Sequence, residues 1–444
     1  MPSITKINAF GSESGQPTDP GVRELLGRCA RSFGPHAVLF YSNPLQLVRS
    51  EGIWLFDHEG RPYLDAYNNV PQVGHCNPKV VQAVARQLAK INIHTRYLNE
   101  DIYNYTEQLL ATFPDPLRRL SLTCTGSESV DLAMRMAYSV TGATGFIVTR
   151  YAYHGNTVAV SSISPSIGPA VAVGSDVRLV DPPDTYRNPN VNIERRLAEH
   201  VDCAIADLGR HGVRLAAMIV DTVFSSDGVF VDPAGFLRTA ADRVRQAGAL
   251  FIADEVQPGF GRTGCHMWGF QRHGITPDVV VMGKPMGNGI PIGGVVTTPE
   301  ILNTFGKSAG YFNTFGGNPV SCAAGKAVLD VLIEENLMSN AAAVGSYLKS
   351  QLQGLSRTHP CIGDVRGAGL FLSVDLVQSR ETREPDGALA PVVINGLRER
   401  GVLVGGTGPS GNMLKIRPPL IFSRENADLL VSTLDEVLGT SAHR

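Results

Sequence analysis

Three apolar runs decide the fold class: LAAMIVD at residues 215–221, LFIADEV at residues 250–256 and VVVMGK at residues 279–284. Each run is nearly continuous in apolar residues, which is typical of a strand covered on both faces within a parallel sheet. Helix-like segments separate the runs, so we predict an α/β protein with a mostly parallel sheet. Ligands of open α/β sheets bind beyond the carboxyl ends of the strands. We therefore expect one crevice to collect the polar residues at the ends of these runs: Asp221, Asp254 and Lys284.

The length of 444 residues predicts a large domain and a smaller one. The expected division is an N-terminal segment that contributes to the small domain, a large cofactor-binding domain and a C-terminal α+β domain: residues 1–67, 68–326 and 327–444. The first segment carries strand-like pieces around the turn HEGRP at residues 58–62.

The last domain is expected to begin with two helices, at residues 328–335 and 341–355. Short strands at residues 370–375 and 402–404 follow, and a terminal helix starts at about Arg424. The polar stretch QSRETREPDG, residues 378–387, is predicted to be an exposed loop.

Charge and composition narrow the classes of partner. With 39 basic and 41 acidic residues the formal net charge is −2, which does not favour nucleic acid or a polyanionic surface as a partner. The chain has no run of eighteen apolar residues, so no membrane span is predicted. Residues 1–20 lack the features of a secretion signal and are interpreted as an arm, which favours a cytoplasmic protein.

The seven cysteines are scattered, without a C-x-x-C pair, which predicts reduced thiols and no metal site. Three of them lie in motif regions and are expected to be small buried hydrophobes: Cys76, Cys124 and Cys265.

The stretch MGKPMGNGIPIGG, residues 282–294, places a single lysine at the end of an apolar strand between glycines. In a desolvated pocket the pKa of a lysine falls and its amine becomes a nucleophile towards carbonyl groups. A lone lysine beside a strand usually extends to solvent, but Asp254 at another strand end favours the nucleophile. A buried carboxylate there needs a partner, and either a protonated pyridine nitrogen or a capped turn would supply one.

Three further segments have both a functional and a structural interpretation. In TGSESVDLAMRMA, residues 125–137, Gly126 and Ser127 precede an amphipathic helix, with Ser127 as the expected N-cap. Such a helix terminus suits a phosphate, although an ordinary capped helix has the same pattern. In YAYHGNT, residues 151–157, an aromatic could stack on a planar cofactor or lie half-buried at a strand end. In YFNTFGGNPVSCAAG, Thr314 could bond a phosphate oxygen or cap the turn.

Taken together, these segments resemble the class III (ω-) aminotransferases of the fold-type I enzymes that use pyridoxal 5′-phosphate (PLP). The matching pieces, from about Val38 to Pro419, are GHCNP, TGSES, AYHGNT, IADEVQPGFGRTG, MGKPMGNGIPIGG and FNTFGGNP. The resemblance implies that Lys284 holds PLP as a Schiff base and that Asp254 pairs with the ring nitrogen. It also implies a homodimer, possibly a tetramer, in which Thr314 reaches the cofactor phosphate of the neighbouring subunit.

The other cofactor contacts implied by the resemblance surround the ring and its phosphate. Gly126 and Ser127 would hold the phosphate, and Tyr153, next to His154, would stack on the ring. Val256 would pack on the opposite ring face and Gln257 would lie near the ring hydroxyl.

Closer matches resemble the ethanolamine-phosphate and 5-phosphohydroxylysine phospho-lyases: NNVPQVGHCNP, PPDTYR, MGKPMGNG, YFNTFGGNPVSCA and LKIRPPL. Lys415 stands where many members that handle carboxylates have an arginine, and lysine cannot make a planar bidentate grip. A substrate without a carboxylate would not need that grip. Asp221-Thr222 and Pro258 depart from the Glu-Pro and Thr of many members. The candidate substrate residues are Arg417, Arg96, Asn69 and Lys415.

The leading hypothesis is therefore a PLP-dependent phospho-lyase that converts O-phosphoethanolamine or a related phosphorylated amine into an aldehyde, ammonia and phosphate. The alternative is an ω-aminotransferase that passes an amino group from an amine or amino acid to a keto acid. A third hypothesis is a catalytically silent binding protein, which the presence of Lys284 and Asp254 disfavours.

Overall fold

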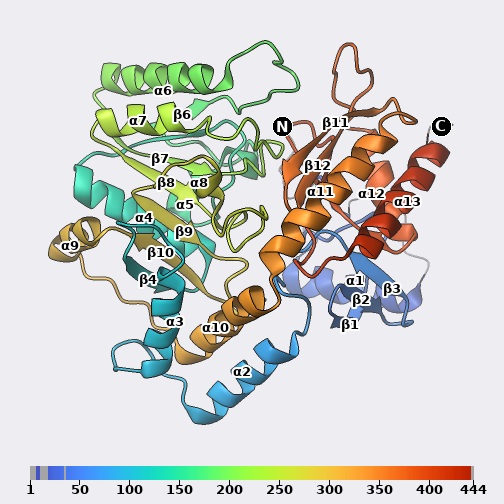
Figure 1. The fold of residues 1–444 in the computed structure, drawn as a ribbon, viewed down its shortest axis with the longest axis horizontal. Helices are drawn as coiled ribbons and strands as arrows, with labels where there is room; N and C mark the ends of the chain where they lie inside the picture. Colours follow the sequence, from blue (N-terminus) through green and yellow to red (C-terminus); the bar gives the residue numbers. More distant parts are fainter. Residues whose placement is uncertain (1–6, 11–18, 35–36, 442–444) are drawn as a thin grey trace.

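The computed structural model describes residues 7–10, 19–34 and 37–441. The arm expected at residues 1–20 lies largely outside this part of the chain. Figure 1 shows a larger body built on a seven-stranded sheet, beside a smaller body that holds two four-stranded sheets. The α/β class and the mostly parallel main sheet predicted from the sequence are confirmed.

The seven-stranded sheet has the order β4-β10-β9-β8-β7-β5-β6. Its strands are β4 (Arg119–Thr123), β5 (Gly145–Thr149), β6 (Val177–Val180), β7 (Leu215–Asp221), β8 (Leu250–Asp254), β9 (Val279–Met282) and β10 (Gly293–Thr297). Within this sheet β10 is antiparallel to both neighbours, while the pairs from β9 through to β6 are parallel.

Helices cover both faces of this sheet, which is why its central strands β7, β8 and β9 are apolar up to their last residues. One face packs against α4 (Gly126–Thr141) and includes Ile219 and Ile252. The other packs against α6 (Ile193–Arg210) and α7 (Arg238–Gln246) and includes Met218 and Phe251. Successive side chains of a strand point to opposite faces, so each central strand contributes to both apolar layers. Short helices α5 (Val158–Ser161) and α8 (Gly269–Arg272) and the longer α9 (Pro299–Ser308) complete this body.

The smaller body combines strands from the early part of the chain with strands and helices from the late part. In one sheet, β1 (Leu47–Glu51), β2 (Trp54–Asp57) and β3 (Pro62–Asp65) form a meander, and β3 pairs in parallel with β13 (Val402–Leu403). The other sheet has the order β11-β12-β15-β14 and is antiparallel. Its strands are β11 (Ile362–Ala368), β12 (Phe371–Leu376), β14 (Gly405–Thr407) and β15 (Met413–Ile416). The helices α11 (Leu337–Leu355), α12 (Leu389–Glu399) and α13 (Arg424–Ser441) lie beside these strands (Figure 1).

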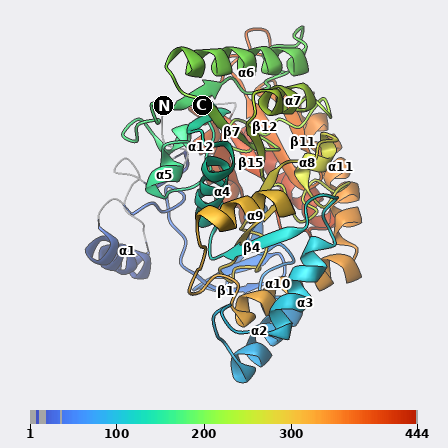
Figure 2. The same cartoon turned by 90° about the vertical axis from the view of Figure 1, so that its left-hand side faces the viewer.

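Four more helices complete the described fold: α1 (Pro20–Phe33), α2 (Pro78–Lys90), α3 (Glu100–Leu110) and the largely buried α10 (Pro319–Glu334). In Figure 2, α1 lies to one side of the main body. The helix expected at residues 328–335 begins at Pro319 instead, because Asn318 caps it and proline is well suited to the first helical position. The following helix begins at Leu337, before the expected residue 341.

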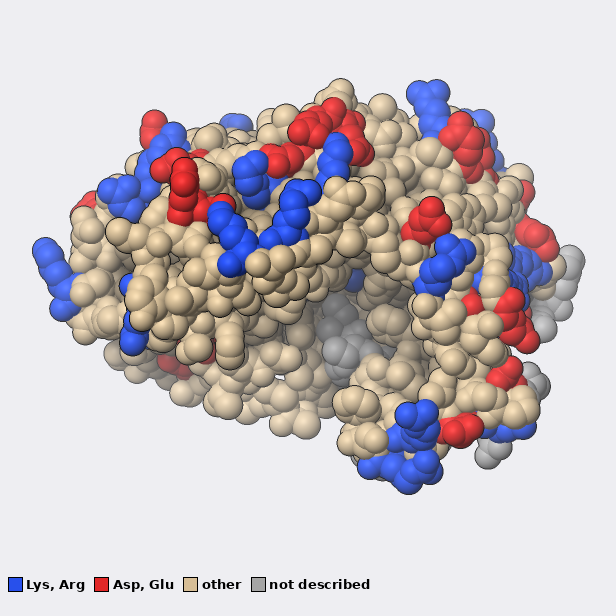
Figure 3. Space-filling view, turned by 90° about the horizontal axis from the view of Figure 1, so that it is seen from below, with Lys and Arg blue, Asp and Glu red and all other residues tan. Residues whose placement is uncertain are grey.

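The surface bears out the balanced composition. Basic and acidic side chains lie next to one another on the face seen in Figure 3, which is hollowed near its centre. In the described part of the chain no helix combines the length and apolar character that a membrane span needs. All seven cysteines are free thiols. Cys76 and Cys265 are exposed and Cys124 is half-buried, so the expectation of three buried hydrophobes is wrong; their glycine-containing turns lie near the surface.

Candidate active site

The three polar strand ends meet in one cavity, as expected. Asp221 and Asp254 are directly paired residues of β7 and β8, and Lys284 follows the end of neighbouring β9. The cavity has a volume of about 120 Å³. It is lined by Thr125, Gly126, Ser127, Tyr153, His154, Gly155, Asp221, Asp254, Val256, Gln257 and Lys284.

Lys284 has the character of a nucleophilic amine. Burial lowers its pKa to about 8, and the positive charge of Arg417 acts in the same direction. Among the described residues, no hydrogen bond or ion pair engages its Nζ atom. The backbone around it is closely packed, since a Cβ atom on Gly283 would lie 3.1 Å from the backbone of Gly126. The end of β9 and the start of α4 therefore approach each other closely.

Asp254 is buried and accepts two hydrogen bonds that orient its carboxylate. Its Oδ2 atom lies 2.7 Å from Nδ1 of His154, and its Oδ1 accepts from the amide of Val256 at 3.0 Å. The Nε2 atom of His154 is buried and has no partner among the described residues. His154 thus fixes the orientation of Asp254 within the cavity lining.

Asp221, the departure from the common Glu-Pro pair, is also satisfied by its own chain. It accepts hydrogen bonds from the amides of Val223 and Ser225, both at 3.0 Å, and from the Ser225 hydroxyl. Burial raises the pKa of Asp221, and the charge of Asp254 raises it further. The two paired strand ends therefore bring two carboxyl groups into one low-dielectric site.

The start of α4 corrects one prediction. The N-cap is Thr125 instead of Ser127: its hydroxyl accepts from the amide of Glu128, whose carboxylate accepts from the Thr125 amide in return. This reciprocal pair is the Thr-x-x-Glu capping box, which was visible in the sequence. Ser127 lies in the first turn, bonded to Asn156. The amides of Gly126 and Ser127 have no intrahelical carbonyl to bond, which leaves them available to an anion.

The segment after β15 reaches the cavity through Arg417, which contacts the lining residue Gln257. The Nη1 group of Arg417 donates to Oε1 of Gln257, and its guanidinium carbon lies 4.6 Å from the ring centre of Tyr67. Gln257 in turn donates to the Ser225 hydroxyl at 2.6 Å. A hydrogen-bonded chain therefore runs from Arg417 through Gln257 and Ser225 to Asp221.

Lys415 lies two residues before Arg417 and is buried, with 4% of its surface exposed. Burial holds its pKa well below the usual range, and the charge of Arg417 lowers it further. Its ammonium nitrogen lies 5.7 Å from the ring centre of Phe371. Lys415 on β15 and Arg417 just after it thus act on each other, and the charge of Arg417 acts on Lys284 as well.

Two predicted residues are not brought to this cavity within one chain. Arg96 and Thr314 are exposed, and the guanidinium of Arg96 stacks 3.8 Å from the ring centre of Phe312. A third, Asn69, is buried at 2% exposure, and its Nδ2 atom has no partner among the described residues.

Sequence reasoning missed the part played by Ser225 and Asp227. Asp227 accepts from the Thr149 hydroxyl at 2.7 Å and from the Tyr151 amide at 3.1 Å, which ties it to the loop that carries Tyr153. Burial raises the pKa of Asp227 to about 7. The only sequence signal was that VDTVFSSDGVF departs from the usual family stretch.

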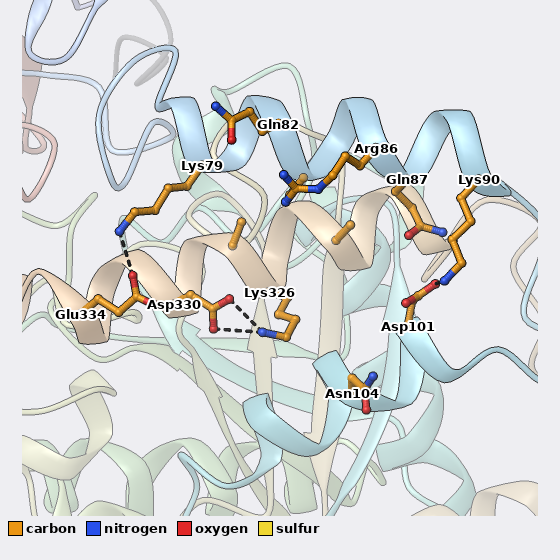
Figure 4. A pocket seen from close by; sticks show the side chains of 13 residues that line it. Lys79, Gln82, Arg86, Gln87, Lys90, Asp101, Asn104, Lys326, Asp330 and Glu334 are labelled. Atoms are coloured by element: carbon orange, nitrogen blue, oxygen red, sulfur yellow. Dashed lines mark hydrogen bonds and ion pairs between the residues drawn. The ribbon is translucent and has the colours of Figure 1, made fainter.

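A second, more open groove of about 580 Å³ lies between α2, α3 and α10 (Figure 4). Its lysines are paired with acids: Lys79 with Glu334, Lys90 with Asp101 and Lys326 with Asp330. This groove therefore lacks the buried, unpaired polar groups that mark the cavity around Lys284.

Comparisons with known proteins agree with this geometry. The family model for aminotransferase class-III matches residues 40–438. The chain is 42% identical to an alanine–glyoxylate aminotransferase 2-like protein of Drosophila melanogaster, over 89% of this chain and 83% of that one. It is 38% identical to ethanolamine-phosphate phospho-lyase homolog 1 of Caenorhabditis elegans, over 94% and 93%. A solved phospholyase from Arthrobacter, in complex with phosphoethanolamine, superposes with a TM-score of 0.91 at 46% identity, covering 94% of this chain and 99% of that chain.

Proposed function

Because this chain belongs to the class III aminotransferase family, we propose that it is a PLP-dependent phospho-lyase. Its substrate is O-phosphoethanolamine or a related phosphorylated amine. The products are an aldehyde, ammonia and inorganic phosphate. The phospholyase similarity supports this choice within the family.

Pyridoxal 5′-phosphate is the cofactor, and the residues of the cavity fit it. Lys284 supplies an accessible amine, and Asp254 supplies a carboxylate for the pyridine nitrogen. The amides of Gly126 and Ser127 suit the phosphate, and the unpartnered Nε2 of His154 adds a buried polar group to the same wall. When bound, this cofactor withdraws electrons from the carbon that carries the substrate nitrogen.

The observation that carries the proposal is the pair of cations on β15 and just after it. Lys415 and Arg417 are both buried, and neither forms an ion pair with a carboxylate of the described residues. Burying a cation without a partner is costly unless a ligand supplies the opposite charge. A phosphorylated amine supplies a dianion for these two residues and an amine that would take the place of Lys284 on the cofactor.

Lys284 is placed to move the proton that starts the reaction. We assign its free amine as the base that takes a proton from the carbon bearing nitrogen. Asp254, held by His154, keeps the electron-withdrawing ring nitrogen protonated. The carbon–oxygen bond at the neighbouring carbon then breaks, and phosphate leaves with the electron pair. Addition of water to the remaining two-carbon fragment gives acetaldehyde and ammonia, so no keto acid is consumed.

The test is phosphate release without a second substrate. The PLP-loaded protein and O-phosphoethanolamine should yield acetaldehyde, ammonia and phosphate in equal amounts over many turnovers. Other phosphorylated amines serve as a panel, and ethanolamine lacking phosphate serves as the control. If no phosphorylated amine releases phosphate, the proposed function is wrong.

The second candidate is an ω-aminotransferase, which the likeness to the alanine–glyoxylate aminotransferase 2-like protein favours. It predicts that an amine plus pyruvate gives alanine. Lys415 counts against it, because a lysine grips a keto-acid carboxylate less well than the planar fork of an arginine. Alanine formation without phosphate release would establish this alternative.

We also propose that the active species is a homodimer. A run of exposed apolar side chains surrounds Arg96 and Thr314: Tyr97 is 60% exposed, Leu98 90% and Phe315 72%. Exposed apolar patches of this kind mark interaction surfaces, and a second copy would bring Arg96 and Thr314 to its cavity. Sedimentation of the loaded protein should show a dimer. The variant Leu98→Asp should weaken it, and an active monomer would contradict the assignment.

A further inference from the structure

The small antiparallel sheet and the residue just beyond its strand β15 carry three buried polar side chains close together. Ser373 of β12 is the directly paired residue of Lys415 on β15. Directly opposite residues of an antiparallel pair project from the same face, with Cβ atoms about 4.5–5.5 Å apart. Arg417 lies two positions beyond Lys415, just after the end of β15, and its charge acts on Lys415. We call Ser373, Lys415 and Arg417 the β12–β15 triad.

The members of the β12–β15 triad have donors that the protein does not use. The Ser373 hydroxyl is fully buried and the Nε group of Arg417 is buried, and neither has a partner among the described residues. Among the described residues no hydrogen bond or ion pair engages the ammonium group of Lys415, which lies 5.7 Å from the ring centre of Phe371. Buried polar groups are nearly always hydrogen-bonded, so three neighbouring residues with unused donors favour a bound ligand.

The nearby carboxylates do not fill this role. Asp221 accepts from the Ser225 hydroxyl and two amides, and Asp227 accepts from Thr149 and Tyr151. Neither forms an ion pair with Lys415, since the ion pairs of the described residues do not include one. Their charges favour the protonated form of Lys415, while Arg417 and Lys284 oppose it.

The β12–β15 triad also adjoins the cavity of Lys284. Arg417 donates to Gln257, which lines that cavity. The positive charge of Arg417 lowers the pKa of both Lys284 and Lys415. A ligand held by the triad would therefore lie beside the reacting amine.

We propose that Ser373, Lys415 and Arg417 form a preassembled subsite for a tetrahedral dianion, the phosphate group of the substrate. The identity of the ligand rests on the proposed function, whereas the subsite rests on the unused donors. Lys415 neutralises one charge, Arg417 a second, and the Ser373 hydroxyl donates a further hydrogen bond. A flat carboxylate with one charge satisfies fewer of these donors, so the triad selects phosphate over carboxylate.

The test uses the PLP-loaded enzyme, so that the cofactor occupies its own phosphate site. Calorimetry with inorganic phosphate gives a dissociation constant, and phosphate release gives KM and kcat for O-phosphoethanolamine. We expect Lys415→Met to raise both the dissociation constant and KM by about 10- to 100-fold, and Ser373→Ala by several-fold. Lys415→Arg should recover part of the loss. Lys326→Met, which removes a lysine paired with Asp330 in the distant groove, is the charge-matched control and should change neither constant.

A second readout separates binding from a structural role. Replacing an unpartnered buried amine by methionine should leave Tm and PLP content unchanged or raise Tm. If Lys415→Met is unstable, Ser373→Ala and Lys415→Arg still decide the question through phosphate affinity. The subsite is refuted if Lys415→Met and Ser373→Ala both bind inorganic phosphate within twofold of the wild type, or if a stable Ser373→Ala does so when Lys415→Met cannot be measured, even when the wild type is an efficient phospho-lyase. Conversely, phosphate binding that depends on the triad, without any phosphate release, supports the subsite and rejects the proposed function.

Discussion

The strand ends of the seven-stranded sheet and the β12–β15 triad treat buried charge in opposite ways. On the strand ends, Asp221 and Asp254 accept hydrogen bonds from their own chain. On the triad, Ser373, Lys415 and Arg417 keep donors that nothing in the described chain accepts. Carboxylates that the protein satisfies can hold a fixed orientation towards a cofactor. Unsatisfied buried donors lower the folding stability of the protein without its ligand, and binding of an anion restores that stability.

On the strand-end side of this comparison, removing Lys284 should have the largest effect on turnover, because Lys284 is the reacting group itself. Lys284→Ala should lower turnover on the order of 10⁴-fold, since it loses both the attachment point and the proton-transfer base. Borohydride reduction and peptide mapping of the wild type should place the PLP adduct on Lys284. An adduct on another lysine would show that the cavity has been misassigned.

Asp254→Asn tests the satisfied side of the comparison. The amide keeps the shape of the carboxylate but loses the charge that holds the ring nitrogen protonated, so kcat should fall by roughly 10²- to 10³-fold. Tm should stay near that of the wild type, because the Val256 amide still finds an oxygen acceptor. Steady-state kinetics with a thermal melt measures both, and a near wild-type kcat would sink the electron-sink role.

The pH dependence of cofactor uptake tests how the strand ends and Arg417 of the triad act together on Lys284. Its pKa is lowered to about 8, so the neutral, nucleophilic amine predominates above pH 8 and the ammonium below it. The rate at which the apoprotein takes up PLP should therefore rise roughly tenfold between pH 7 and pH 9. Stopped-flow absorbance follows the uptake. A midpoint at pH 10 or above would mean that burial does not tune this amine, and Arg417→Met should move the midpoint upward.

The smallest expected effect separates the two residues that begin α4. Thr125→Ala removes the N-cap and should lower the free energy of unfolding by about 1 kcal/mol. Ser127→Ala should lower the free energy of unfolding less than Thr125→Ala does. It should weaken PLP retention more, because Ser127 lies in the first turn, where the cofactor phosphate is proposed to bind. Chemical denaturation and PLP titration of both variants provide the measurements. Equal losses in both assays would contradict the division of roles.

Much of this protein was predictable from local patterns. Continuous apolar runs require cover on both faces, so LAAMIVD, LFIADEV and VVVMGK predicted buried parallel strands. Parallel strands end at a common edge, so the same runs predicted that Asp221, Asp254 and Lys284 would meet. The Thr125 cap is also present in the sequence as a Thr-x-x-Glu pattern, so the prediction of Ser127 as the N-cap is wrong on a signal that the sequence contains.

Other features depend on pairings that no local pattern encodes. Ser373 and Lys415 are 42 residues apart in the chain and become neighbours only through the register of β12 and β15. The chain from Arg417 to Asp221 likewise needs the small sheet to lie against the loop after β7. The sequence pattern around a lysine or a serine within a strand is the same whether or not its donor forms a hydrogen bond in the folded protein. Burial and the absence of an acceptor are properties of the packed molecule, so only the tertiary structure decided which donors await a ligand.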